Sequence, residues 1–347
     1  MDVILQKWHI KIYEFIVYKV NPMVKAAEKR KKIFDRFSTH LSELNKEGKL
    51  AGIELKHDNT YICPICLNQF SNADLKSVST NMLTSEDSPP DCLGGKKVAL
   101  TCKECNNRCG RELDFHLQEG LLEIDSREFL PYSTRKAEVT IGGVTVKGEI
   151  RVTEKSVEVH VSEKNNNPEV AKEHLTKVVP NEVATVKPKP SRVDPLKFEV
   201  ALLKSAYILA FAKFGYNLFL DPCYDVVREQ LNKPDQRIYP EGFFTKQPFT
   251  KEQEGIYFIL EKGYESIFVI LPVMTKSSTR RFGVALPLPN IPIEKVAGKL
   301  KEQDAGFGLT VEFMGGNEVD YLTNKEEVNK LNNLVRSINS PEPAAPK

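Results

Sequence analysis

The chain has 347 residues, 41% of them hydrophobic, which is enough for two or three domains with their own cores. Its 49 Lys and Arg residues nearly balance 47 Asp and Glu residues, so the chain is no polycation and nucleic-acid contacts would depend on local charge. Charged residues interrupt the apolar first twenty residues, which excludes a bilayer-spanning run of about 18 residues, and no signal-peptide cleavage site follows. We therefore expect a cytoplasmic protein with no membrane partner.

The first predicted element is an amphipathic helix. Asn21-Pro22 is typical of an N-cap followed by proline at the first helical position, and Gly48 marks the end. One face is apolar: Ile33, Phe34, Phe37, Leu41 and Leu44. The opposite face is basic: Lys25, Lys29, Arg30, Lys31, Lys32 and Arg36. The pattern fits either an ordinary solvated face or a face that contacts phosphates.

The segments after residue 130 predict a smaller β-structure, a linker and a second domain. Residues 137–161 alternate apolar and polar residues around Gly142-Gly143 and Lys147-Gly148, as in a β-hairpin or meander. Residues 163–193, rich in Asn, Lys, Pro and Glu, are predicted to be a linker with a short helix after Pro168. A helix from Asp194-Pro195 to Gly215 is apolar almost all round, so we expect it to be buried.

The rest of the second domain is predicted to mix helix and strand. Asp221-Pro222 begins a helix through Leu231, and residues 255–273 predict two strands joined near Lys262-Gly263. Further strands are expected in residues 282–288 and 308–314, and the final residues 339–347 are predicted to be a disordered tail.

Four of the seven cysteines form two Cys-x-x-Cys pairs, Cys63/Cys66 and Cys102/Cys105. Two such pairs match a closed tetrahedral site for structural Zn²⁺, whereas a redox dithiol would need only one pair. The odd number of cysteines also argues against a secreted disulfide framework. A site with four thiolates has no open coordination position, so this zinc would stabilise the fold and take no part in chemistry.

The residues between and after the pairs, "LTSEDSPPDCLGGKKVALTCKECNNRCGRELDFHL", carry a resemblance. Bracketing cysteine pairs, an acidic residue before Pro-Pro, a Gly-Gly turn and "CNN" together resemble the HNH, or ββα-metal, endonucleases. The match covers roughly residues 61–117. It implies a hairpin and a helix held by zinc, and a divalent cation, Mg²⁺ or Mn²⁺, held by Glu86 and Asn106. The oxygen atoms of both side chains suit such an ion.

The sequence departs from the family at Asp87, where the family has the histidine that acts as general base. An ordinary carboxylate is a weak base unless burial or neighbouring charge raises its pKa, so Asp87 fits a second metal ligand better. Three outcomes stay open. The site is a slow or differently arranged nuclease, its base comes from elsewhere such as His116, or it binds without cutting.

Neighbouring residues extend the predicted site. His116 fits either a partly buried helix histidine or a catalytic or phosphate-facing group, and Asp114 or Glu112 could complete the metal shell. The basic residues around the site favour phosphate contact: Lys96, Lys97, Lys103, Arg108 and Arg111. The apolar helix and its aromatic residues, Tyr207, Phe211, Phe214, Tyr216 and Phe219, are typical of a core rather than a ligand site.

The predicted fold class is α+β. The expected order is an N-terminal helical region (1–60), a zinc-bound HNH-like module (61–130), a β-hairpin or meander (131–162), a linker (163–193), a separate C-terminal α+β domain (194–338) and a tail (339–347). The leading hypothesis is a metal-dependent DNA endonuclease. The resemblance also implies a bacterial phage-defence setting, with a partner defence protein bound through the C-terminal domain. The alternatives are a non-catalytic adaptor that binds nucleic acid or protein, and a purely structural zinc fold.

Overall fold

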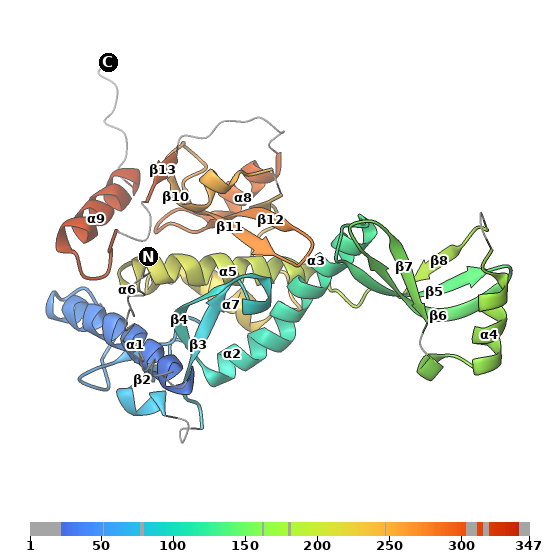
Figure 1. Ribbon diagram of the computed structural model, residues 1–347. Coiled ribbons are helices and arrows are strands. Elements are labelled where there is room, and N and C mark those ends of the chain that lie inside the picture. Colours follow the sequence, from blue (N-terminus) through green and yellow to red (C-terminus); the bar gives the residue numbers. More distant parts are fainter. Residues whose placement is uncertain are drawn as a thin grey trace, which may run out of the picture.

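The protein is described here by a computed structural model that mixes helices with antiparallel sheets (Figure 1). It describes residues 22–50, 52–76, 80–161, 163–179, 182–246, 248–302, 311–314 and 319–339. The predictions for residues 1–21 and 340–347 lie outside this range. The helices are α1 (Pro22–Lys46), α2 (Lys103–Cys109), α3 (Phe115–Arg127), α4 (Pro168–Lys177), α5 (Pro195–Phe214), α6 (Tyr216–Phe219), α7 (Asp225–Asn232), α8 (Ile293–Glu302) and α9 (Lys325–Asn339).

The strands form four antiparallel sheets among the described residues. They are β1 (Tyr61–Ile62), β2 (Gln69–Phe70), β3 (Leu83–Ser88), β4 (Lys96–Cys102), β5 (Thr134–Ile141), β6 (Val144–Val152), β7 (Val157–Val161), β8 (Thr185–Pro188), β9 (Phe244–Thr245), β10 (Gly255–Ile259), β11 (Ser266–Met274), β12 (Thr279–Leu286) and β13 (Val311–Phe313). Two of the sheets are the short pairs β1-β2 and β3-β4. The larger ones are the five-stranded β13-β10-β11-β12-β9 and the four-stranded β7-β6-β5-β8.

Helix α5 is the centre of the molecule, as its apolar sequence predicts. The Asp194 side chain accepts hydrogen bonds from the backbone N–H groups of Leu196 and Lys197, and Pro195 occupies the first turn. The helix contacts the β3-β4 hairpin, α3, and strands β11 and β12, so its residues are buried on several sides. Among the described helices, none has both the length and the apolar character that a bilayer crossing requires.

The C-terminal sheet does not form a separate domain, in contrast to the prediction. One continuous hydrophobic core runs from Phe34 and Phe37 of α1, through the zinc module and α5, to β11 and α9. In β11 the six residues from Ser266 to Leu271 are all buried, because neighbouring elements cover both faces of this central strand. The prediction of a separate domain was wrong because α5 buries side chains in both directions, which an all-round apolar sequence permits but does not assign to particular partners.

A lobe built from β5 to β8 and α4 projects from the end of α3 (Figure 1). The predicted turn at Gly142-Gly143 joins β5 to β6, whereas Lys147-Gly148 lies within β6. The lobe has its own small core, lined by Val139, Val146 and residues near them, separate from the main core. The segment 163–193, predicted to be a linker, contributes α4 and the edge strand β8. Backbone hydrogen bonds attach β8 to β5, and its exposed residues have no apolar pattern that a sequence could reveal.

Candidate metal centre and the polar site beside it

The four predicted zinc ligands lie together. Cys63 and Cys66 stand in the turn between β1 and β2, Cys102 ends β4, and Cys105 lies in the first turn of α2. All four sulfur atoms lie within 4.8 Å of one another, and Cys66 Sγ is 3.8 Å from Cys102 Sγ. A Zn–S bond of about 2.3 Å gives a tetrahedron edge of about 3.8 Å, so the donor set fits zinc. Among the described residues this is the one such group of three or more His, Cys, Asp or Glu side chains.

Tyrosines hold the cysteine turn against the rest of the molecule. Tyr61 Oη donates to the carbonyl of Leu100 on β4 and accepts from its N–H. Tyr216 Oη makes the same double contact with the backbone of Ile62, and Tyr207 Oη donates to the carbonyl of Pro64 at 2.6 Å. All three tyrosines are fully or almost fully buried, which confirms the prediction that the aromatic residues of α5 and α6 form core. The metal centre is therefore part of the main body of the protein.

A hairpin followed by a helix forms the site next to the cysteines. Strands β3 and β4 pair antiparallel with a bulge at Glu86/Asp87, and β4 leads directly into α2. The loop between the strands passes very close to itself, because a Cβ atom at Gly95 would lie only 1.5 Å from the carbonyl oxygen of Pro89. A side chain at position 95 would collide with the backbone of Pro89, so the loop requires glycine there.

Glu86 is buried and bound on both carboxylate oxygens. Its Oε1 lies 2.7 Å from Nζ of Lys204 on α5, and its Oε2 accepts a 2.7 Å hydrogen bond from Thr101 Oγ1. The side chains of Glu86 and Lys204 are each only 2% exposed. The predicted metal-binding carboxylate is thus occupied by an ammonium group of the chain itself.

Asp114 completes a buried ionic triad. Lys204 Nζ donates to its Oδ1 at 2.9 Å and to its Oδ2 at 2.8 Å. Asp114 ends a π-helical turn, Gly110–Asp114, between α2 and α3. The additional residue of such a turn rotates the residues after it around the helix axis by about 100°. Burial alone would lower the pKa of Lys204, but Glu86 and Asp114 outweigh it and raise that pKa, so the ammonium stays charged.

Asn106 lies on the same face of the hairpin as the triad. Its Nδ2 donates to Thr84 Oγ1 at 2.8 Å and to the Ser85 carbonyl at 3.2 Å, and Thr84 Oγ1 donates to the Thr101 carbonyl. Because Thr101 also donates to Glu86, a short series of hydrogen bonds connects Asn106 with the triad. The structure therefore places Asn106 near Glu86, but its amide group donates to the hairpin.

Asp87 is half-buried near Lys97, its neighbour across the hairpin. Burial raises the pKa of Asp87 above the ordinary carboxyl value, Asp91 and Glu86 add to this rise, and Lys97 opposes it. Desolvation is therefore the largest effect on the pKa of this carboxyl group.

His116 belongs to a different part of the molecule. Its Nδ1 accepts a 3.0 Å hydrogen bond from the backbone N–H of Asp194, at the beginning of α5. Lys204 lies ten residues further along this helix, about 15 Å along its axis. The pKa of His116 is lowered, first by burial and then by Lys197. His116 thus helps to hold the beginning of α5 and is remote from Glu86.

Sequence reasoning missed Lys204. A single lysine within the apolar run of α5, "VALLKSAYILAFA", was an available signal, because a buried ammonium needs carboxylate partners. Comparison of the chain with family models, with curated proteins and with solved structures finds no match.

Proposed function

We propose that the protein is a nucleic-acid-binding adaptor whose zinc-held hairpin and helix resemble an HNH nuclease but do not cleave. The observation that carries this proposal is the Lys204 ammonium, bound by Glu86 and Asp114 in a site shielded from water. A divalent cation at Glu86 would have to displace an ammonium group 2.7 Å away, against strong charge repulsion. Asp87, in place of the family's histidine, agrees with the loss of cleavage.

Exposed basic residues around the hairpin support the nucleic-acid part of the proposal. Lys96 and Lys97 begin β4, Lys103 begins α2, and Arg111 follows in the π-helical turn; all four are exposed. Among the described residues none of the four has an ion-pair partner, so their charge is available to phosphates. Such contacts attach a protein to the nucleic-acid backbone without reading its sequence. The resemblance to DNA-cleaving proteins makes DNA the first ligand to test.

A metal-dependent endonuclease, in phage defence or elsewhere, is the second candidate. One specific observation favours it: burial raises the pKa of Asp87, which makes this carboxylate a stronger base than an ordinary aspartate. In addition, no described residue donates a hydrogen bond to Asn106 Oδ1, so this oxygen is available to coordinate a metal ion. In this case Lys204 would have to withdraw when the ion binds.

One set of assays separates the two candidates. Purified protein is incubated with plasmid and linear duplex DNA in Mg²⁺ or Mn²⁺, together with the variants Asn106→Ala and Asp87→His. The adaptor proposal expects binding that survives EDTA too mild to remove zinc, and no cleavage by any of the three proteins. Asp87→His should stay inactive because Lys204 still occupies Glu86. Metal-dependent cleavage that is lost in Asn106→Ala would reject the adaptor in favour of the endonuclease.

A further inference from the structure

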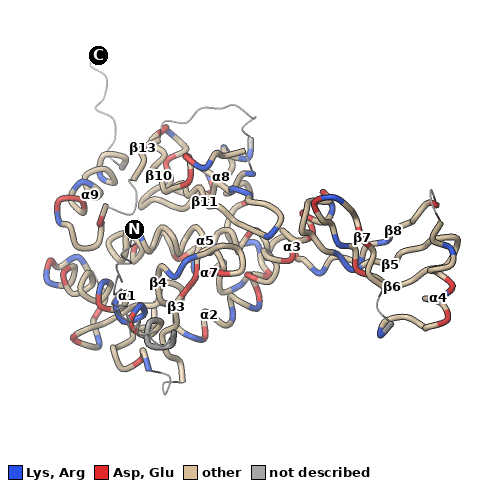
Figure 2. The backbone as a smooth tube through the Cα atoms, viewed as in Figure 1, with Lys and Arg blue, Asp and Glu red and all other residues tan. Residues whose placement is uncertain are grey.

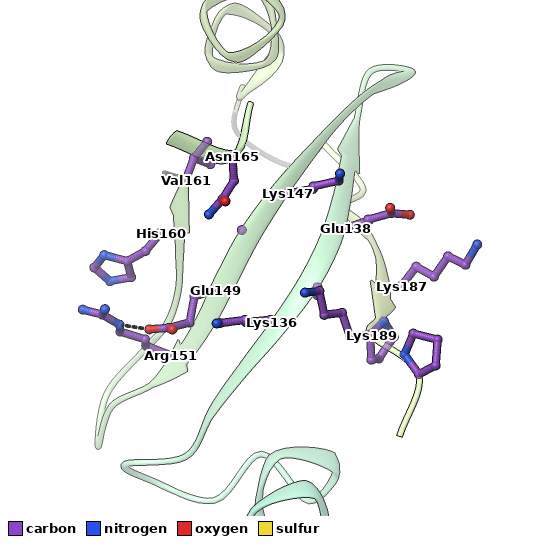
Figure 3. A pocket seen from close by; sticks show the side chains of 14 residues that line it. Lys136, Glu138, Lys147, Glu149, Arg151, His160, Val161, Asn165, Lys187 and Lys189 are labelled. Atoms are coloured by element: carbon purple, nitrogen blue, oxygen red, sulfur yellow. Dashed lines mark hydrogen bonds and ion pairs between the residues drawn. The ribbon is translucent and has the colours of Figure 1, made fainter. Parts of the chain in front are cut away.

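The open face of the lobe sheet holds a cavity of about 530 Å³ (Figure 3). Residues from all four strands line it, and its floor is the sheet itself. Helix α4 packs against the opposite face of β5 and β6, where Val139 and Val146 are buried. The cavity therefore lies on the side of the lobe that α4 leaves uncovered.

Basic side chains dominate this cavity. Five of them are exposed: Lys136 on β5, Lys147 and Arg151 on β6, and Lys187 and Lys189 on or just after β8. Two carboxylates line the cavity, those of Glu138 and Glu149, and both are half-buried. A third, Glu158 on β7, lies opposite Arg151 on the same face and pairs with His160 at 2.9 Å. Figure 2 marks these charges along the lobe strands, and Figure 3 shows the labelled lysine side chains around the sheet.

The two cavity carboxylates offset only part of the positive charge of the lysines. Glu149 Oε1 is held by Arg151 Nε at 2.6 Å, and Glu138 stands between Lys147 and Lys187 in the strand register. None of the four lysines has an ion pair with any residue in the described part of the chain. In the register Lys136 stands opposite Glu149, and Lys147 and Lys187 both stand opposite Glu138, so cross-strand pairing offsets part of the charge. Because basic side chains outnumber the carboxylates, the face keeps a net positive charge that attracts an anionic ligand.

The spacing and chemistry of the face fit a row of phosphates. Lys147 and Lys187 lie on strands separated by β5, about 10 Å apart at a strand spacing of about 4.8 Å. At this separation the two ammonium groups can contact different phosphates of one DNA strand, whose charges recur about every 3.4 Å along the helix axis. Among the described residues that line the cavity, none is Phe, Tyr or Trp, so the face offers no platform for stacked bases.

We propose that the open face of the β5–β8 sheet is a second nucleic-acid contact, which binds the phosphate backbone of duplex DNA through Lys136, Lys147, Lys187 and Lys189. This inference rests on the proposed adaptor function and gives it a binding surface away from the zinc module. The lobe projects from the main body on α3, so both surfaces would hold one duplex at two separate places. Four phosphate contacts would contribute a salt slope of about −3.6, or about a 150-fold weakening between 50 and 200 mM salt.

The test uses the full chain and a fluorescent 30-base-pair duplex, with affinity measured by anisotropy between 50 and 200 mM salt. The test variant replaces the four lysines by alanine (K136A, K147A, K187A and K189A). The matched control removes four exposed lysines elsewhere on the same lobe, K155A, K164A, K172A and K177A. Circular dichroism checks that both variants are folded. Poly-glutamate serves as a competing acidic polypeptide.

We expect the test variant to bind at least 10-fold more weakly at 100 mM salt, with a salt slope reduced by about 3.6, and the control to lie within about 2-fold of the wild type. Equal losses in both variants, or no loss in the test variant, would overturn this inference and leave the adaptor function standing. Competition by poly-glutamate as strong as that by unlabelled DNA would assign the face to an acidic protein instead, which also overturns it. Absence of any DNA binding by the wild type would reject the adaptor function itself.

Discussion

Replacing Lys204 by methionine tests whether the Lys204 ammonium is required to stabilise the buried carboxylates of Glu86 and Asp114. Methionine keeps the length and most of the packing volume of the lysine side chain, so the cavity effect is small. The change leaves the carboxylates of Glu86 and Asp114 without their shared cation, and the Glu86 side chain is only 2% exposed. Removing one partner of a buried ion pair costs about 3–5 kcal/mol.

An independent estimate gives a similar magnitude. The variant can avoid a buried charge by protonating one carboxylate, which costs about 1.4 kcal/mol for each pH unit above the ordinary carboxyl pKa of about 4. At pH 7 this amounts to about 4 kcal/mol. The folded variant then binds a proton that the unfolded chain does not bind, so its loss of stability should shrink as the pH falls from 7 to 5. The Asp114 side chain is 19% exposed, so in the variant water can still solvate its charge in part, and this carboxylate contributes less to the loss of stability than Glu86.

Urea denaturation followed by circular dichroism at pH 7 and pH 5 measures these effects. Lys197→Met is the matched control on the same helix, because Lys197 pairs with Asp235, whose side chain is 74% exposed, and a surface pair contributes at most about 1 kcal/mol. The double variant Glu86→Gln/Lys204→Met should regain most of the lost stability, since the amide needs no counter-charge. The reasoning is refuted if Lys204→Met lies within 1 kcal/mol of the wild type, or if the double variant is as unstable as the single one.

The remaining predictions concern the metal centre and pH. Cys63→Ser should contain no zinc when measured by elemental analysis and should unfold at a lower temperature, because three thiolates no longer close the site. The control Cys92→Ser removes an exposed thiol and should keep both zinc and stability. The other prediction concerns His40 of α1. Its Nδ1 donates a hydrogen bond to the Leu322 carbonyl, and its Nε2 is buried without a partner among the described residues. Burial lowers the pKa of this histidine. As the pH falls, the imidazole of His40 therefore binds a proton in the unfolded chain before it does so in the folded protein. The free energy of unfolding should be constant in this respect above about pH 6.5 and should decrease at lower pH by up to about 1.4 kcal/mol per pH unit. His40→Asn should remove this part of the pH dependence, and an unchanged profile in the variant would contradict the assignment.

Local sequence patterns predicted helix boundaries and the cysteine cluster well, because proline, glycine and paired cysteines each have a well-defined structural role. Prolines in the first turns of α1, α4 and α5 mark where these helices begin, and Gly48 and Gly215, both with positive φ, follow the ends of α1 and α5. The Cys-x-x-Cys spacing predicted the four-thiolate cluster because each pair closes its own tight turn. In contrast, β8 and β9 are short edge strands whose residues are exposed or half-buried, so periodicity revealed little about them. Helix α8 does carry apolar residues at helical spacing, Ile293, Val296, Ala297 and Leu300, a signal that the predictions above did not use.

The candidate site could be predicted in part only. The sequence indicated that Glu86 and Asn106 lie near each other, because they belong to a hairpin end and a helix start joined by the cysteines. It could not indicate that an ammonium from α5 reaches Glu86, since Lys204 and Asp114 are 90 residues apart. Likewise, the direction of the Asp87 pKa depends on how much neighbouring structure covers it.

The amino-acid sequence alone indicated the four-cysteine cluster, the beginnings of α1, α4 and α5, and the all-round apolar character of α5, because spacing and capping act over a few residues. Tertiary structure decided the rest: which helix fills the site beside the cysteine cluster, that one core extends from α1 to α9, and that lysines on or next to three strands share one face. The physical reason is that buried charges and sheet faces obtain their partners from distant segments. Only the packing of the whole chain brings such partners together.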